Sequence, residues 1–180
     1  MQPFPIASGL SAPLLSALAL AALLAAPAQA DVPSPEETVR EAKVAHWRQA
    51  YPGTAPAMEA SLSPDGRAML LRIKAGAPAS YTVFIDGKEA AKGQFAELKG
   101  GVRTERIVLA GHPGQDVRTV HVDYRLRGVA RLEEGLRETG EEIAGCLRAR
   151  YGVAQSGGKP VLKSLGLSEE DADILRLCGI

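Results

Sequence analysis

The stretch that decides the fold begins RAMLLRIK at residues 67–74 and ends VRTVHVDYRLR at residues 117–127. Apolar and polar side chains alternate in both segments, and a period of two places them on opposite faces of a pleated strand. In the second segment one parity is apolar and comprises Val120, Val122, Tyr124 and Leu126. We therefore expect a β core with strands at residues 67–74, 80–86, 88–98, 102–110 and 117–127.

Short turn signals separate these predicted strands. Ser63-Pro64-Asp65-Gly66 precedes the first strand, and Asp86-Gly87 is a favoured two-residue hairpin turn. Because strand follows strand with no crossover helix, antiparallel pairing is expected and a parallel α/β fold is disfavoured. The turns are similar to those of immunoglobulin-like sandwiches, an analogy that concerns the fold and carries no function.

A helix is expected before the β core. Ser34 and Glu37 have the spacing of a capping box, Pro35 suits the first helical position, and Pro52-Gly53 ends the pattern. Trp47, the only tryptophan, falls among the apolar residues of this helix. We expect it to pack in the core, with an exposed binding anchor as the alternative.

The pattern after residue 128 favours helices. Apolar residues recur there at helical spacings, namely Val129, Leu132, Leu136, Ile143 and Leu147. This predicts an amphipathic helix over residues 129–147, with a bend near Gly140. Ser168 then begins a short last helix.

These elements predict an α+β fold with a mainly antiparallel, sandwich-like and immunoglobulin-like β core, an N-terminal helix and two C-terminal helices. In domain terms we expect a signal peptide at residues 1–30 and a single domain at 31–180. Within that domain, residues 31–53 form the N-terminal helix, 54–127 the β core and 128–180 a helical C-terminal part.

The first 30 residues carry no charged side chain and contain a 13-residue apolar run at 14–26, followed by Ala28-Gln29-Ala30. This layout is typical of a secretory signal peptide, since about 20 apolar residues are needed to span a bilayer. We expect an exported chain, periplasmic or secreted, with no stable membrane span. An uncleaved anchor is the alternative, because no Lys or Arg precedes the apolar run.

The two cysteines, Cys146 and Cys178, are most simply joined in an exported chain. The disulfide would pin the last helix onto the predicted helix at 129–147 and contribute up to about 3.7 kcal/mol of stability. A redox-active pair is the alternative, but a C-x-x-C spacing is missing.

Composition limits the partners. The chain has 21 basic and 21 acidic residues, all after residue 30, so it lacks the basic surplus that nucleic acids or anionic membranes require. The expected partner is another exported protein, and no cofactor is expected.

Three residues form the one candidate for chemistry. His121 and Asp123 share a strand face, and His112 lies in the preceding loop, so together they suit a metal ion or a base with its orienting carboxylate. Any alternating polar strand face produces the same pairs, and the nucleophile-elbow and phosphate-loop motifs are absent from the sequence.

The predicted binding surface is the loop at 111–116 with the polar face of the following strand, because loops on a rigid sheet concentrate binding residues. Its candidate residues are His112, Gln115, His121, Asp123, Arg125 and Arg127. A charged strand edge that resists aggregation explains the same side chains. We expect an exported non-enzymatic binding or accessory module, such as an envelope assembly factor or an inhibitor of a partner protein. The alternatives are a small hydrolase or metal-dependent enzyme using His112, His121 and Asp123, and a carrier of a small ligand.

Overall fold

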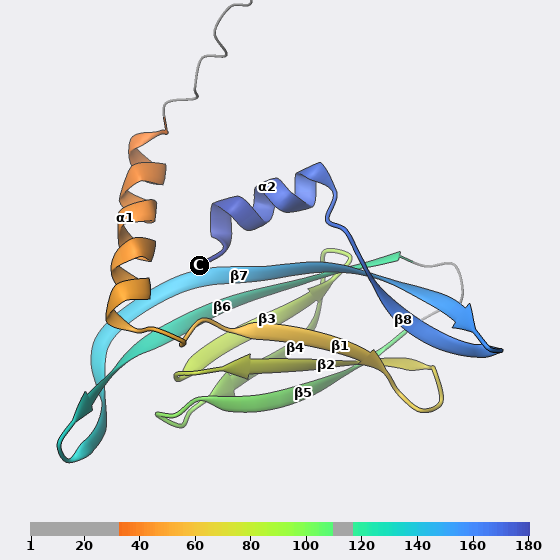
Figure 1. Cartoon of the computed structure of the whole chain (residues 1–180), viewed down its shortest axis with the longest axis horizontal. Helices are drawn as coiled ribbons and strands as arrows, with labels where there is room; N and C mark the ends of the chain where they lie inside the picture. Colours follow the sequence, from red (N-terminus) through yellow and green to blue (C-terminus); the bar gives the residue numbers. More distant parts are fainter. Residues whose placement is uncertain (1–32, 110–116) are drawn as a thin grey trace, which may run out of the picture. The chain divides into compact units, whose positions relative to one another are not determined.

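Two antiparallel sheets and two helices make up the part of the chain that the computed structural model describes, residues 33–109 and 117–180 (Figure 1). The helices are α1 (Pro35–Ala50) and α2 (Glu169–Cys178). The strands are β1 (Ala57–Leu62), β2 (Ala68–Ala75), β3 (Ala79–Ile85), β4 (Lys88–Phe95), β5 (Gly101–Val108), β6 (Val117–Leu132), β7 (Gly135–Ser156) and β8 (Lys159–Leu165). One sheet has the strand order β1-β2-β5, and the other has the order β4-β3-β6-β7-β8.

The turns follow the local sequence. Asp86 and Gly87 have φ angles of 50° and 77°, the left-handed pair that a tight hairpin between β3 and β4 requires. At the turn before β2, the Gly66 amide donates to the Ser63 carbonyl at 2.8 Å, and Gly66 has a φ of 68°. The predicted strand boundaries in this region are therefore confirmed to within a few residues, apart from the longer reach of β6.

Side chains from both sheets share one hydrophobic core. β2 contributes Met69, Leu71 and Ile73, all at most 1% exposed. From the other sheet, β3 contributes Tyr81 and Val83, and β6 contributes the predicted apolar set, Val120, Val122, Tyr124 and Leu126. The period-two alternation of β2 and β6 thus identifies the core face of each sheet correctly.

α1 begins with the predicted capping box. The Glu37 amide donates to Ser34 Oγ at 3.2 Å, and the Ser34 amide donates to Glu37 Oε2 at 2.7 Å. Trp47 is 3% exposed and belongs to the core cluster, which confirms the core interpretation of this side chain. At the end of α1, the Tyr51 hydroxyl donates to Glu141 Oε2 on β7 at 2.5 Å.

The predicted helix at 129–147 is wrong. Residues 117–132 and 135–156 form the long hairpin of β6 and β7, and beyond residue 127 these two strands extend past the rest of the sheet (Figure 1). Only the second half of the predicted helix has the period of a strand, since Ile143 and Leu147 share one parity with Ala149 and Tyr151, and these four lie in or against the core. Pairing with β6 supplies hydrogen bonds that local helix formation would otherwise have to provide, and three glycines weaken the helix.

The C-terminal part is therefore largely strand, and it contains one helix rather than two. β7 also pairs with β8 through the Gly157-Gly158 turn, so the predicted helical part at 128–180 is wrong except for α2. The predicted α+β class is confirmed, as a mostly antiparallel fold with two sheets and two helices in the described residues. Within the described residues, no helix has the length and apolar character needed to cross a bilayer.

The Cys146–Cys178 disulfide is confirmed. It joins the end of α2 to the middle of β7, so the helix is pinned onto a strand and not onto a second helix. Figure 1 shows α2 along the side of β7 that faces away from the three-stranded sheet.

Candidate functional site

The polar residues of β6 lie on the outer face of the five-stranded sheet, the face opposite the core. Val120, Val122 and Leu126 are fully buried, and successive side chains of a strand alternate between faces. His121, Asp123 and Arg125 therefore project from the side on which α2 lies.

Cross-strand pairing places other residues beside them. Asp123 lies opposite Thr82 on β3 and opposite Cys146 on β7. Arg125 lies opposite Ser80 on β3 and opposite Ala144 on β7. Directly opposite residues of neighbouring strands share a face, so short side chains flank both charged residues.

These short side chains leave a hollow of about 630 Å³ beside the end of α2. Its floor is built from Ser80, Thr82, Gly93, Ala144 and Gly145. Longer side chains also line the hollow, namely Arg40, Lys92, Asp123, Arg125 and Leu177. The hollow thus follows from small residues on β4, β3 and β7, while Asp123 and Arg125 rise from β6, the strand between β3 and β7.

The hollow carries more positive than negative charge. Arg40, Lys92 and Arg125 line it together with one carboxylate, that of Asp123. Arg40 donates to the Gly179 carbonyl at 2.6 Å, which connects α1 to the end of the chain. Among the residues that the structure describes, the side chain of Arg125 has neither an ion-pair nor a hydrogen-bond partner.

The remaining charges of the hollow are at least partly compensated. Lys92 Nζ lies 3.1 Å from Glu89 Oε2, and both side chains are exposed. Asp123 Oδ1 accepts a hydrogen bond from His121 Nε2 at 2.8 Å. Arg125 is therefore the charge best placed to meet an incoming anion.

His121 lies at the boundary of a second hollow, of about 460 Å³, to which Asp123 also contributes. Because a carboxylate accepts, His121 Nε2 carries the proton, and Nδ1 accepts from Arg148 Nη1 at 3.3 Å. Only 17% of the His121 side chain is exposed. Both ring nitrogens are thus engaged in hydrogen bonds with neighbouring side chains.

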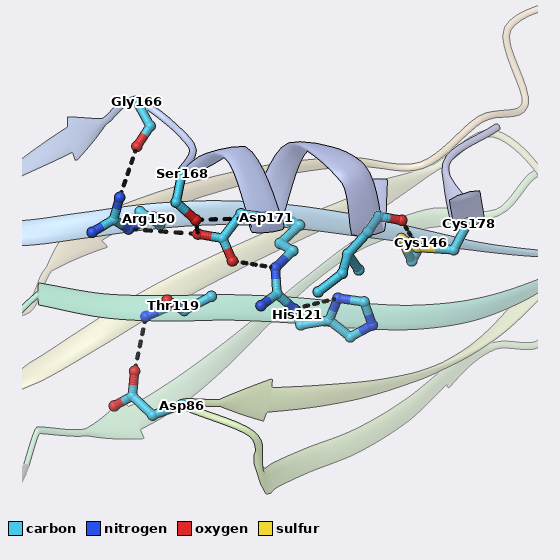
Figure 2. A network of polar contacts seen from close by, with 11 residues as sticks. Asp86, Thr119, His121, Cys146, Arg150, Gly166, Ser168, Asp171 and Cys178 are labelled. Atoms are coloured by element: carbon cyan, nitrogen blue, oxygen red, sulfur yellow. Dashed lines mark hydrogen bonds and ion pairs between the residues drawn. A yellow bond between two sulfur atoms is a disulfide. The ribbon is translucent and has the colours of Figure 1, made fainter. Parts of the chain in front are cut away.

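Arg148 also anchors the start of α2. Its Nε donates to Asp171 Oδ1 at 2.6 Å, and Arg150 Nε lies 3.6 Å from Asp171 Oδ2 (Figure 2). The Ser168 hydroxyl donates to the same carboxylate at 2.6 Å. This hydrogen bond first, and then Arg148, hold the pKa of Asp171 below its usual range.

Part of the predicted site is brought together by the structure. His121, Asp123 and Arg125 line the two adjoining hollows. Arg127 lies farther along β6, where its Nη1 pairs with Glu138 Oε1 at 3.1 Å. His112 and Gln115 lie outside the described residues, so the predicted trio of His112, His121 and Asp123 stays a prediction.

The sequence interpretation missed the residues that other elements contribute. Arg40 comes from α1, Lys92 from β4, and Arg148 from β7. The alternation at Arg148 and Arg150, which points both away from the core, was a usable signal. Strand register, which places Lys92 opposite Thr82, has no comparable local signal.

No protein-family model, curated protein or solved structure matches this chain. What this chain can bind or catalyse therefore has to be inferred from its own residues. Acid–base catalysis by His121 requires a lone pair facing a substrate, and Nδ1 faces Arg148 instead. The arrangement is better suited to holding an anionic group against Arg125.

Proposed function

We propose that this chain is an exported, non-enzymatic binding module that holds a short acidic segment of another exported protein in the hollow beside α2. The observation that carries the proposal is Arg125, an exposed cation on a rigid strand that lines a hollow of about 630 Å³. A hollow of this size lies within the range of about 300–1,000 Å³ found for ligand sites.

The charges favour an acidic ligand. Three cations and one carboxylate line the hollow, although the chain as a whole has zero net charge. Guanidinium groups bind carboxylates through paired hydrogen bonds, and complementary charge accelerates encounter with the partner. The apolar Leu177, which is 51% exposed and also lines the hollow, suits an adjacent apolar side chain of the ligand.

The scaffold supports a binding role. We infer that the two sheets stack as a sandwich-like pair, since one core cluster draws side chains from both. Export is inferred from the apolar segment at residues 14–26, and the disulfide is compatible with an oxidising compartment. The alternative of an enzyme using His112, His121 and Asp123 has less support, because Arg148 occupies the His121 nitrogen that a base would use.

A charge-reversal variant tests the proposal. Arg125→Glu with Lys92→Glu should change folding little, because both side chains are exposed. Binding of a fluorescent glutamate-rich peptide should weaken at least about tenfold, and binding by the wild type should fall as salt is raised. The matched control is Arg131→Glu with Lys163→Glu, which makes the same charge change at exposed positions outside the hollow.

The control variant should bind the peptide as the wild type does. A glutamine-rich peptide of the same length should bind the wild type poorly. If the two peptides bind equally, or if both variants lose binding to the same extent, recognition does not depend on this hollow. The same variants then serve as baits for partners from the exported fraction.

A further inference from the structure

His121 lies beside the disulfide that ties α2 to the sheet. One ring nitrogen of His121 and the sulfur atoms of Cys146 and Cys178 all lie within 4.8 Å of one another (Figure 2). Cys146 is opposite Asp123, the residue two positions after His121, so strand register alone places Cys146 and His121 on the same face. A structural disulfide does not by itself require a histidine at this position.

The three side chains form a recognisable set of metal ligands once the sulfurs are thiolates. Zn²⁺ binds thiolate sulfur at about 2.3 Å and imidazole nitrogen at about 2.0–2.1 Å, so its ligand atoms are separated by roughly 3.5–4 Å. In the disulfide each sulfur is bonded to the other and carries no charge, so the same cluster is a poor ligand set. The redox state of the two cysteines therefore decides whether a site exists.

The surroundings of His121 already fix the tautomer that a metal needs. Asp123 Oδ1 accepts from Nε2 at 2.8 Å, which leaves the lone pair on Nδ1. A carboxylate that accepts from the second nitrogen of a ligating histidine is the usual outer partner of a metal site. In the oxidised chain Arg148 Nη1 donates to Nδ1 at 3.3 Å, so a metal would have to displace this contact, whereas a different nitrogen, Nε, makes the 2.6 Å contact with Asp171.

We propose that reduction of the Cys146–Cys178 disulfide creates a binding site for one thiophilic divalent cation, best matched by Zn²⁺, with both sulfurs and His121 Nδ1 as ligands. A dithiol supplies two electrons and two protons and becomes a disulfide itself, leaving two thiols on this chain. Metal binding releases those two protons, and water completes the tetrahedron. α2 is then held on β7 by the metal in the reduced chain and by the disulfide in the oxidised chain.

Cobalt titration tests the proposal on the mature chain. A phosphine reductant opens the disulfide, taking up the oxygen atom of water and leaving two thiols. Co²⁺ alone is then added to oxidised and reduced protein under anaerobic conditions. The reduced chain should bind one equivalent, with thiolate-to-cobalt charge-transfer absorption and the visible bands of tetrahedral coordination, and Zn²⁺ should displace it. The oxidised chain should show neither Co²⁺ binding nor these absorption bands.

Variants separate the histidine from the two thiols. In reduced protein, His121→Ala and His121→Gln should weaken Co²⁺ binding at least about tenfold, and Asp123→Asn should weaken it less. His46→Ala is the matched control, because His46 is an exposed histidine on α1 that pairs with Glu141, and it should bind as the wild type does.

Three results would overturn the proposal. They are a reduced wild type without the charge-transfer band, histidine variants at position 121 that bind Co²⁺ as tightly as the wild type, and an oxidised chain that binds equally well. Loss of α2 docking on reduction, seen as a fall in helical circular dichroism with no cobalt signal, counts as the first of these results.

Discussion

At the scale of single residues, Asp171 holds the start of α2 on the sheet. It is 6% exposed and contacts Ser168, Arg148 and Arg150. A carboxylate so enclosed is stable only because hydrogen bonds and cations replace its water. Removing its charge leaves Arg148, whose side chain is 18% exposed, without its closest partner.

Asp171→Asn should therefore lower the free energy of unfolding by about 2 kcal/mol, below the usual cost of breaking a fully buried pair because Arg148 regains some water. Because the pKa of Asp171 is lowered in the folded state, its contribution is complete above the unfolded value of 3.8 and is lost as pH falls through the folded value. The difference in free energy of unfolding between the wild type and Asp171→Asn should thus shrink below about pH 4. Urea unfolding at several pH values measures it.

Asp173→Asn is the matched control for that change. Asp173 is 68% exposed, and within residues 33–109 and 117–180 it pairs only with Arg176, one turn along α2 at 3.6 Å. An exposed pair of this kind contributes little, so the free energy of unfolding should change by less than about 0.5 kcal/mol. Equal effects of the two substitutions would mean that Asp171 does not anchor the helix.

At the scale of elements, β7 connects most of the features described above. It pairs with β6 and β8, carries Cys146 and Arg148, and contacts Tyr51 at the end of α1. Gly145 lies in its middle, opposite Tyr124. A Cβ at Gly145 would lie 2.6 Å from Ile180 Cγ1 and 2.7 Å from Tyr124 Cζ, closer than real contacts allow.

Gly145→Ala should consequently destabilise the protein by about 1–3 kcal/mol, the usual cost of overpacking. In a helix the same substitution would stabilise by about 1 kcal/mol, because alanine is the better helix former. The sign of the change in urea unfolding thus distinguishes the strand from the predicted helix. Gly166→Ala is the control, since its Cβ meets nothing within 4 Å, and it should change the free energy little.

The sequence contains enough local information for most of these elements. Alternation identifies β2, β3 and β6, the capping box begins α1, and Asp86-Gly87 ends β3. The helix at 129–147 is wrong although its apolar residues have helical spacing, because pairing with β6 over the whole segment overrides that local pattern. A local sequence pattern carries no information about pairing with a distant strand.

At the scale of the whole molecule, the candidate site depends on how distant segments meet. Alternation predicts that His121, Asp123 and Arg125 share a face, and this is confirmed. The contributions of Arg40 and Lys92 depend on helix docking and sheet order, which no spacing in the sequence encodes. The two cysteines are far apart in sequence, yet chemistry alone predicts their pairing, because two cysteines in a chain that is expected to be exported have one simple bridge.

Export and oxidation should leave a joint signature in the mass of the mature chain. Removal of residues 1–30 by signal cleavage gives a chain that starts at Asp31, and formation of the Cys146–Cys178 bond removes two hydrogens. The intact mass of protein from the exported fraction should therefore equal that of residues 31–180 less two hydrogens. It should rise by two hydrogens after reduction, because the bridge is the chain's one disulfide. A mass that retains residues 1–30 would instead identify the apolar segment as an anchor. A mass of residues 31–180 without the loss of two hydrogens, measured before reduction, would show that the chain is exported without forming the bridge.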